Sequence, residues 1–350
     1  MNLKELAAHL GLSQTTVSRA LNGYPEVSEA TRKRVAHAAE QHNYSPNTRA
    51  KGLATGRAMA VGHVIPTSTR HEMVNPIFGD FISGAGETYA QNGYDMVLSM
   101  VEDGDQARVY RELKAKGTVD GLILHGPAAA EPRIGLLREL GLPFCVHGRS
   151  TNEQAPYSWV DVNNKSAFER ATELLADLGH RRIALLNGLE AMDFARRRRA
   201  GFEAAMATRG LVADPALMRS EEMTETYGYD SAREMLALAD APTAFLVSSM
   251  IVAIGVRRAV EETGLALGAD VSVITHDDDL SYLRNGGEVP LFTATRSSVR
   301  EAGQIAAKLL LDQIANPGSP IRTQLLEAPL VLGTSTGPAP KVTAAPRAAE

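Results

Sequence analysis

The sequence predicts an α/β protein in which a small all-helical segment precedes a larger module built on parallel sheets. Three observations support this fold class. The first 45 residues carry helical spacings of apolar residues and no strand pattern. From residue 58 onward, short apolar runs alternate with helical stretches. The chain has 350 residues, which is long enough for two or three domains.

The bulk composition is that of a globular protein. The single cysteine, Cys145, excludes an intrachain disulfide framework and is expected to be a buried structural thiol in a reducing cytoplasm. No run approaches the ~18 uncharged apolar residues of a membrane span, and the N-terminus has no apolar signal core. We therefore expect a cytoplasmic protein without a membrane partner.

Charge is unevenly distributed along the chain. The net charge is −5, but residues 1–57 hold eight Lys and Arg against four Asp and Glu, an excess of four positive charges. The remaining residues therefore carry a net charge of −9. A basic head on an acidic body favours nucleic-acid binding by the head alone.

The first predicted helix begins with a capping box. Asn2 and Glu5 have the spacing at which each side chain can bond the backbone amide of the other. Apolar residues then recur at i, i+3, i+4 and i+7, which gives the helix one apolar stripe. Gly11 follows where a C-terminal glycine would end the helix.

Two further helices are predicted in the head. Ser13 can cap a helix over Gln14–Leu21, and Ser28 can cap a third helix that extends to about residue 42. The third helix carries the basic run 32–34, which we expect to meet phosphate.

The second helix presents a polar face opposite its apolar residues. This face holds Gln14, Thr15, Ser18 and Arg19, none of which is acidic. In the major groove of DNA, Arg can bond guanine bidentately and Gln can bond adenine. From periodicity alone, a generic helical bundle is an equally good interpretation.

The literal sequence favours DNA binding. Residues 12–23 (LSQTTVSRALNG), 27–32 (VSEATR) and 43–47 (NYSPN) closely resemble the head of the lactose-repressor (LacI/GalR) family. The resemblance implies a helix-turn-helix head over residues 1–45. The DNA contacts that we predict within it are Gln14, Thr15, Thr16, Ser18, Arg19 and Asn22.

In that family a hinge helix follows the Pro-Asn pair, orders on operator DNA and wedges a leucine into the minor groove. Residues 46–57 would be this hinge and linker, with Leu53 as the wedge and Arg49 or Lys51 near the DNA backbone. The alternative is a flexible linker.

The body is predicted to contain parallel sheets with helices on both faces. Ligands of such sheets bind beyond the carboxyl ends of the strands, so polar residues after each apolar run are candidates. The predicted strands are 60–65, 94–101, 119–125, 143–147, 182–187, 243–248 and 271–276, and predicted helices include 77–92, 167–178 and 199–209.

The body also resembles the LacI/GalR family, through residues 178–184 (LGHRRIA) and 270–274 (DVSVI). The resemblance implies a core over residues 58–337, similar to periplasmic sugar-binding proteins, with an effector in the cleft between two lobes. We expect one lobe at 58–160 plus 291–325 and the other at 161–289 plus 326–337. The tail 338–350 is expected to be disordered.

Three effector-binding candidates in the second lobe follow from the resemblance. Arg198 and Asp277 match the family's effector-binding Arg and Asp, and together they offer donors and acceptors for vicinal hydroxyls. A solvated basic face is the alternative for Arg198, which lies in a run of arginines. Met250 stands where many relatives have a carboxylate, so the usual monosaccharide pose is in doubt.

Three further effector-binding candidates, His125, His147 and Arg149, lie at strand ends of the first lobe. Two more are Phe78, at the start of a predicted helix, and Asp161, near the boundary between the lobes. The two histidines belong to different strands without paired metal-ligand spacing, so no metal is expected. Phe78 could stack on a sugar ring or pack in the core. Asp161 could line the cleft or form the crossover between lobes.

These features together predict a repressor of carbohydrate uptake or catabolism genes. A homodimer would bind a palindromic operator and be released by a sugar, with a disaccharide or α-glucoside favoured. The sequence has no Gly-x-Gly-x-x-Gly, phosphate-loop or Gly-x-Ser-x-Gly string, so neither an enzyme nor a cofactor is expected. A transport-type binding protein and a nucleoid protein without an effector are the remaining alternatives.

Overall fold

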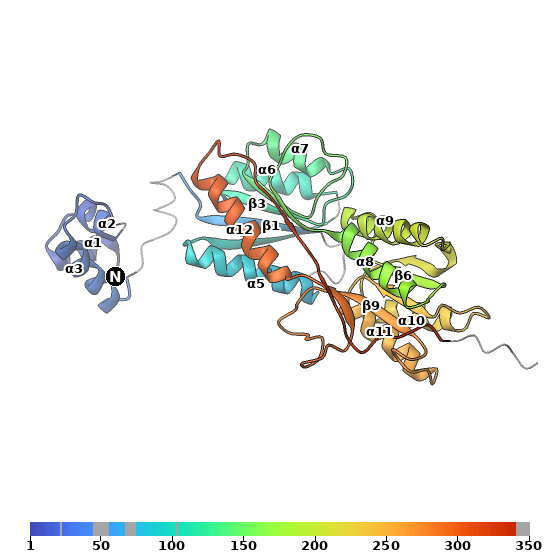
Figure 1. Ribbon diagram of the computed structural model, residues 1–350. Coiled ribbons are helices and arrows are strands. Elements are labelled where there is room, and N and C mark those ends of the chain that lie inside the picture. Colours follow the sequence, from blue (N-terminus) through green and yellow to red (C-terminus); the bar gives the residue numbers. More distant parts are fainter. Residues whose placement is uncertain (22, 45–55, 67–74, 103, 341–350) are drawn as a thin grey trace, which may run out of the picture. The chain divides into compact units, whose positions relative to one another are not determined.

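The structure, a computed structural model, describes residues 1–21, 23–44, 56–66, 75–102 and 104–340 (Figure 1). It divides into a helical unit, Met1–Met59, and an α/β unit that begins at Ala60. The helical unit contains α1 (Leu3–Leu10), α2 (Gln14–Leu21) and α3 (Glu29–Gln41). Its core is a single apolar cluster around Leu6, Val17 and Val35, which are fully buried.

The predicted ends of these helices are confirmed. Asn2 and Glu5 form the reciprocal capping box, each side chain 2.9 Å from the other residue's amide nitrogen. Gly11 ends α1 in the left-handed conformation at φ 61°. The hydroxyls of Ser13 and Ser28 accept the amide N–H groups that begin α2 and α3. Local side-chain chemistry alone therefore sets where the three helices start.

The α/β unit has two six-stranded sheets (Figure 1). The first has the order β11-β5-β4-β3-β1-β2, and its pairs are all parallel. Its strands are β1 (Ala60–Pro66), β2 (Asp95–Val101), β3 (Gly121–His125), β4 (Phe144–His147), β5 (Trp159–Val162) and β11 (Thr323–Leu326). The helices of this lobe are α5 (Pro76–Gln91), α6 (Gln106–Lys116), α7 (Pro132–Glu139) and α12 (Val299–Ala315).

The second sheet has the order β12-β10-β9-β8-β6-β7, and only the β10–β12 pair is antiparallel. Its strands are β6 (Ile183–Asn187), β7 (Met218–Ser220), β8 (Ala244–Val247), β9 (Ser272–Asp277), β10 (Thr293–Arg296) and β12 (Leu330–Val331). Its helices are α8 (Asn164–Asp177), α9 (Asp193–Thr208), α10 (Glu225–Leu236) and α11 (Met250–Glu262), and a short 3-10 turn, η2 (Pro215–Leu217), precedes β7.

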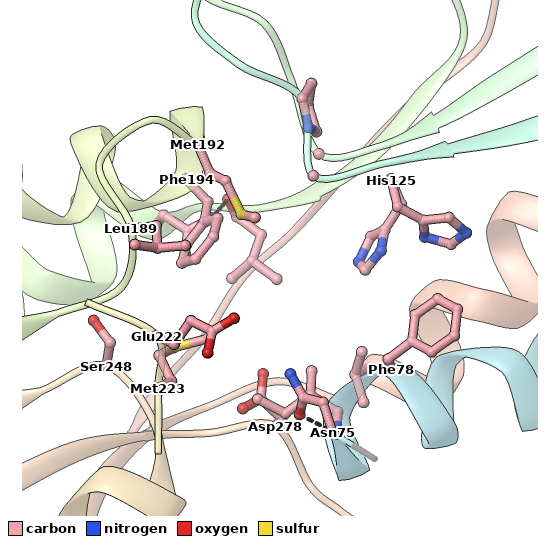
Figure 2. A pocket seen from close by; sticks show the side chains of 18 of the residues that line it. Asn75, Phe78, His125, Leu189, Met192, Phe194, Glu222, Met223, Ser248 and Asp278 are labelled. Carbon is pink, nitrogen blue, oxygen red and sulfur yellow. Dashed lines mark hydrogen bonds between the residues drawn. The ribbon is translucent and has the colours of Figure 1, made fainter. Parts of the chain in front are cut away.

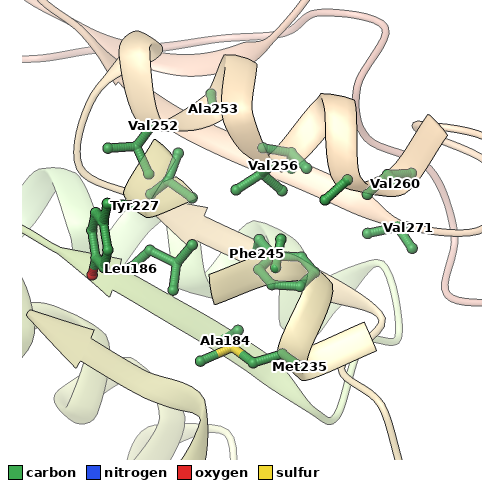
Figure 3. Close-up of a cluster of buried hydrophobic side chains, with 14 of the residues drawn as sticks. Ala184, Leu186, Tyr227, Met235, Phe245, Val252, Ala253, Val256, Val260 and Val271 are labelled. Carbon is green, nitrogen blue, oxygen red and sulfur yellow. The ribbon is translucent and has the colours of Figure 1, made fainter. Parts of the chain in front are cut away.

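Both faces of the second sheet are buried. Along β6, Ala184 and Leu186 pack with α10 and α11 in the cluster of Figure 3, whereas Ile183 and Leu185 pack with α8 and α9. Successive strand residues point to opposite faces, so a strand covered on both sides must be apolar throughout. This is why the central strands stood out in the sequence as continuous apolar runs.

The five strands that the sequence analysis missed, β5, β7, β10, β11 and β12, have only two to four residues each. Most of them contain polar residues, as in the Thr-Ala-Thr-Arg of β10, and β12 is only Leu-Val, so none gives a long apolar run. One lobe boundary predicted from these segments is wrong. β10 pairs with β9, so the chain returns to the first lobe after Arg296 rather than near residue 291.

Two smaller corrections concern the other boundaries. β5 lies wholly in the first sheet, so residues 161 and 162 belong to the first lobe. Residues 338–340 are attached to the second lobe rather than disordered, because the Ala339 amide donates to the Leu178 carbonyl at 2.8 Å. Residues 341–350 lie outside the described part of the chain.

Glycines allow the helix pairs of the α/β unit to approach closely. A Cβ atom at Gly84 of α5 would lie 2.1 Å from the Arg300 carbonyl oxygen, and one at Gly303 of α12 would lie 2.2 Å from the Phe81 carbonyl oxygen. Both distances are far below van der Waals contact. The α5–α12 pair therefore requires glycine at the two positions.

Replacing Gly84 by alanine should destabilise the first lobe. The added methyl group forces α5 and α12 apart, and overpacking of this kind costs roughly 1–3 kcal/mol. Gly79, in the same helix, has open space around its Cα, so Gly79→Ala should leave stability unchanged or raise it. Thermal denaturation of both variants measures the difference. Equal midpoints would show that α5 and α12 are not closely packed at Gly84.

Candidate functional site

The head presents the predicted reading face on α2. Gln14, Thr15 and Arg19 are exposed, while Ser18 is half-buried. Thr16 has a contact within the head itself. Its hydroxyl bonds the hydroxyl of the N-cap residue Ser13 at 2.8 Å, at the start of α2. The remaining predicted DNA contacts, Asn22, Arg49, Lys51 and Leu53, lie outside the described residues.

The basic run at residues 32–34 helps to hold the head together. The Arg34 guanidinium donates to the Leu10 carbonyl at the end of α1, and Arg32 donates to the Gly23 carbonyl at 3.4 Å. Lys33 forms an exposed ion pair with Glu29 at 2.9 Å. The two arginines thus have a structural role in addition to the phosphate contact that the sequence predicted.

The two lobes of the α/β unit enclose a cavity of about 600 Å³ at the carboxyl ends of their strands. Figure 2 shows side chains from both lobes facing this space. Five of the eight predicted effector residues line it, namely Phe78, His125, His147, Asp161 and Arg198. A volume of this size lies within the range of small-molecule sites.

The other three predicted effector residues, Arg149, Met250 and Asp277, do not line the cavity. Met250 begins α11 and points into the core, so its neighbours Ser248 and Ile251 face the cavity instead. Arg149 borders a second pocket, whose lining also includes Trp159.

Asp277 was predicted to bind the effector but does not line the cavity, because β9 ends one residue later than predicted. The sequence predicted that the strand ends at residue 276, but β9 continues to Asp277. His276 and Asp278 consequently face the cavity, whereas the Asp277 carboxylate accepts the Asp279 amide at 2.9 Å. Of these two neighbouring aspartates, Asp278 is therefore the one that lines the cleft.

Arg198 is the buried cation of the cleft. Its Nε donates to the Asn164 amide oxygen at 2.8 Å, and its Nη1 donates to the Ser248 carbonyl at 2.6 Å. The rings of Phe168 and Phe194 each lie 5.0 Å from the guanidinium carbon. Burial lowers the pKa of Arg198 to about 10, which leaves it charged at neutral pH. Arg198 is thus fixed in one geometry, as the functional interpretation requires, and is not part of a solvated basic face.

Asp278 is the titratable acid of the cleft. Burial raises the pKa of Asp278 to about 7, although the Arg198 guanidinium acts in the opposite direction. His276 Nε2 lies 3.6 Å from the Asp278 carboxylate, but burial holds the pKa of His276 well below its usual range. Neutral His276 is held by the Thr295 hydroxyl at 2.9 Å and the Ser297 hydroxyl at 3.2 Å.

His125 and His147 line the first-lobe side of the cavity, and further rings pack against these two imidazoles. The His63 Nδ1 and His125 Nε2 atoms are 2.9 Å apart, and His63 also bonds the Tyr89 hydroxyl at 3.2 Å. The His147 ring stacks on Phe81 with a centroid distance of 4.1 Å. Burial lowers the pKa of His63 to about 3 and that of His147 to about 4. These imidazoles are therefore neutral hydrogen-bonding groups.

Two apolar surfaces lie on opposite sides of the cavity in Figure 2. Phe78 is on the first-lobe side near His125, and Leu189, Met192 and Phe194 are together on the second-lobe side. Phe78 is only 7% exposed, but it borders the cavity, so it serves the core and the cleft at once. The polar side chains of Asn75, Glu222 and Asp278 lie between the two surfaces (Figure 2).

Polar contacts join the two lobes directly. The Thr151 hydroxyl of the first lobe donates to the Asp193 carboxylate of α9 at 2.8 Å, and Arg197 bonds both of these side chains. In a second contact, the Asp80 carboxylate of α5 accepts the amide and hydroxyl of Ser281 at 2.7 Å each. Both contacts fix how far the lobes are closed around the cavity.

Sequence reasoning missed several residues that line the cleft: Asn164, Phe194, Ser248, His276 and Asp278. Ser248, His276 and Asp278 lie at or just after the ends of predicted strands, so the rule that ligands bind beyond strand ends is the signal that could have selected them. Phe194 and Asn164 lie at the starts of α9 and α8, and the predicted helices began several residues too late to include them.

Comparisons with known proteins agree with both units. The family model described as bacterial regulatory proteins, lacI family, matches residues 2–47, and the model described as a periplasmic binding protein-like domain matches residues 172–336. The HTH-type transcriptional regulator AglR of Rhizobium meliloti (strain 1021) is 45% identical over 341 residues, which cover 97% of this chain and 95% of that protein.

Two solved structures are similar over nearly the whole chain. The lac repressor dimer bound to operator and the anti-inducer ONPF has a TM-score of 0.81 at 27% identity, covering 96% of this chain and 99% of that one. The complex of the transcriptional regulator CelR with cellobiose has a TM-score of 0.70 at 27% identity, covering 95% and 99%. Within the described ranges, no helix has both the length and the apolar character needed to cross a membrane.

The raised pKa of Asp278 predicts a pH-dependent stability. An unfolded aspartate ionises near pH 3.8, whereas Asp278 in the folded chain ionises near pH 7. Its stabilising contribution is thus complete below pH 3.8 and is lost as the pH rises through 7. Relative to Asp278→Asn, the wild-type protein should lose roughly 2 kcal/mol of stability between pH 5 and pH 7.5. Thermal denaturation of both proteins tests this, and a pH-independent difference would contradict the buried state of Asp278.

Proposed function

The chain belongs to the LacI family of bacterial regulatory proteins, which are DNA-binding transcriptional regulators rather than enzymes, and from this premise we propose that it is a repressor released from its operator by a neutral disaccharide. The observation that carries the proposal is the cleft, which is lined by the fixed Arg198 donor and the Asp278 acceptor and has an apolar surface on each of two opposite sides. The similarity to a CelR–cellobiose complex supports a disaccharide.

The size of the cleft favours two sugar rings over one. Phe78 and Phe194 lie on different lobes and on opposite sides of the cavity, so each can stack on one ring of the ligand. Asp278 and the imidazole of His147 can accept and donate hydrogen bonds to the hydroxyls between. A single pyranose would leave one of the two surfaces without a partner.

The charges of the cleft favour a neutral ligand over an anionic one. The carboxyl groups that line it are those of Asp161, Glu221, Glu222, Glu225 and Asp278. Among the lining residues that the structure describes, the basic ones are Arg133 and Arg198. Arg133 already forms a bidentate ion pair with Glu131 at 2.5 and 2.6 Å, and Asp161 is already paired with Arg149. A sugar acid or sugar phosphate would therefore meet net repulsion.

Release from DNA follows from thermodynamic linkage. A sugar that binds one arrangement of the lobes more tightly shifts the protein toward that arrangement, and operator affinity falls by the same factor if that state binds DNA poorly. The direct contacts between lobes at Thr151 and Asp193 are the ones such a shift would change. We place two heads on a palindromic operator because one head buries little surface.

A titration of the operator-bound protein with cellobiose, maltose, sucrose, trehalose and glucuronic acid tests the function. Fluorescence anisotropy should show release by one of the four neutral disaccharides and no release by the acid. Operator binding that no sugar alters would favour a nucleoid protein. Sugar binding without any sequence-specific DNA binding would instead favour a transport-type binding protein.

At a pH above 7, where Asp278 is mostly ionised, replacing it by asparagine should lower the affinity for the releasing disaccharide by at least tenfold, because a charged acceptor is lost from the cleft. Asp279→Asn is the matched control. Asp279 is exposed, pairs with Arg296 and has a left-handed backbone that asparagine tolerates. Calorimetric titration of both variants provides the measurement. If the Asp279 variant loses as much affinity as the Asp278 variant, the cleft assignment is wrong.

Arg19→Ala should reduce sequence discrimination by the head. A bidentate Arg–guanine pair contributes roughly 1–3 kcal/mol of discrimination, so the ratio of specific to non-specific DNA affinity should fall about tenfold or more. Lys33→Ala, on α3, should weaken both affinities equally and leave the ratio unchanged. The assay uses an operator selected from random-sequence duplexes. An unchanged ratio for Arg19→Ala would remove this residue from the reading face.

A further inference from the structure

A second pocket of about 340 Å³ lies outside the sugar cleft, where the first lobe meets α9 of the second. The first lobe contributes Arg149, the loop that follows it and Trp159, while the second lobe contributes Arg197. Pockets formed between two lobes are common places for ligands. Neither Arg149 nor Arg197 lines the sugar cleft, and the contacts that they make with Asp161, Asp193 and Thr151 use only some of their guanidinium nitrogens.

Arg149 is held so that part of its guanidinium is available. Its Nε donates to the Asp161 carboxylate at 2.7 Å, and the guanidinium carbon lies 4.9 Å from the centre of the Trp159 ring. Asp161 is itself fixed by the Asn164 amide at 3.3 Å. Among the described residues, the Nη1 and Nη2 atoms of Arg149 have no hydrogen-bond partner. The guanidinium is thus oriented before any ligand arrives.

Arg197 supplies a second oriented guanidinium from the other lobe. Its Nε donates to the Asp193 carboxylate at 2.6 Å and its Nη2 donates to the Thr151 hydroxyl at 2.9 Å. Its Nη1 has no partner within the part of the chain that the structure describes. The side chains of Arg149 and Arg197 are 22% and 24% exposed, so a ligand in solution can reach both.

The carboxylates at this pocket already have partners, because Asp161 and Asp193 pair with the Nε atoms of the two arginines. Glu153 is the carboxylate that lines it, and this side chain accepts the Ala155 amide at 2.9 Å and faces Arg138 at 3.8 Å. The Ser150 hydroxyl is also committed, because it donates to the Ala129 carbonyl at 2.7 Å.

We propose that this pocket is a second ligand site, which takes a small organic anion carrying a phosphoryl or carboxylate group. Two guanidiniums with free Nη atoms can donate charge-assisted hydrogen bonds to two or more oxygens of one such group. The volume leaves room for a carbon skeleton beside Trp159. Among the described residues, the pocket differs from the sugar cleft in offering two oriented guanidiniums whose Nη atoms include unpaired ones.

Calorimetric titration of the full chain with inorganic phosphate, glucose 6-phosphate, citrate and glucose tests the proposal. Glucose 6-phosphate or citrate should bind, and glucose should not bind in this pocket. Thr323→Glu places a negative charge on an exposed position of the pocket wall without breaking any contact, and should weaken the anion at least tenfold. Arg197→Gln should weaken it similarly.

Arg199→Gln is the control, because Arg199 lies on the same helix, pairs with Glu190 and Glu203, and borders neither pocket. It should leave anion binding unchanged. Absence of binding by all three anions would overturn the proposal. Binding that survives both Thr323→Glu and Arg197→Gln would do the same, because the anion would then sit elsewhere, for example on the basic head. The outcome of the anion titration does not depend on the proposed disaccharide, because cellobiose binding is measured in a separate titration.

Discussion

The parallel direction of the strands is the constraint on which the α/β unit depends. Because parallel strands of one sheet all end at the same edge, the two lobes bring their strand ends to a shared cleft. Polar groups gather there because the rest of each central strand is buried on both faces and must be apolar. The position of the site thus follows from the parallel direction of the strands. The helix pairs pack closely because glycines stand where their backbones meet.

Burying charge in this cleft sets its chemistry. Arg198 remains ionised because Asn164, the Ser248 carbonyl and two aromatic faces replace its water. Asp278 has fewer such partners, so burial shifts its ionisation to near pH 7. The neutral histidines of the first lobe add hydrogen-bonding capacity without charge. A cleft of this kind is suited to polyols, which offer many hydroxyls and no net charge.

The sequence predicted those parts of the molecule that are determined by residues close together in the chain. The helix caps of the head, the continuous apolar strands and the family resemblance all depend on residues close in the chain. Asp277 and Met250 were misplaced because a one-residue change at a strand end, or one step along a helix, redirects a side chain. Arg149 was predicted to line the cleft because it follows a strand end. In the fold its side chain pairs with Asp161 and borders the second pocket instead, which no local pattern in the sequence shows. Short polar strands such as β10 acquire their structure from pairing with distant residues, which no local pattern reveals.

A crystal structure of the α/β unit with the releasing disaccharide would test the central claim most directly. The account predicts one sugar ring on Phe78, the other beside Phe194, and ligand hydroxyls within hydrogen-bond distance of Arg198 and Asp278. A sugar bound outside this cleft, or one held by Asp277 with Asp278 turned away, would contradict it.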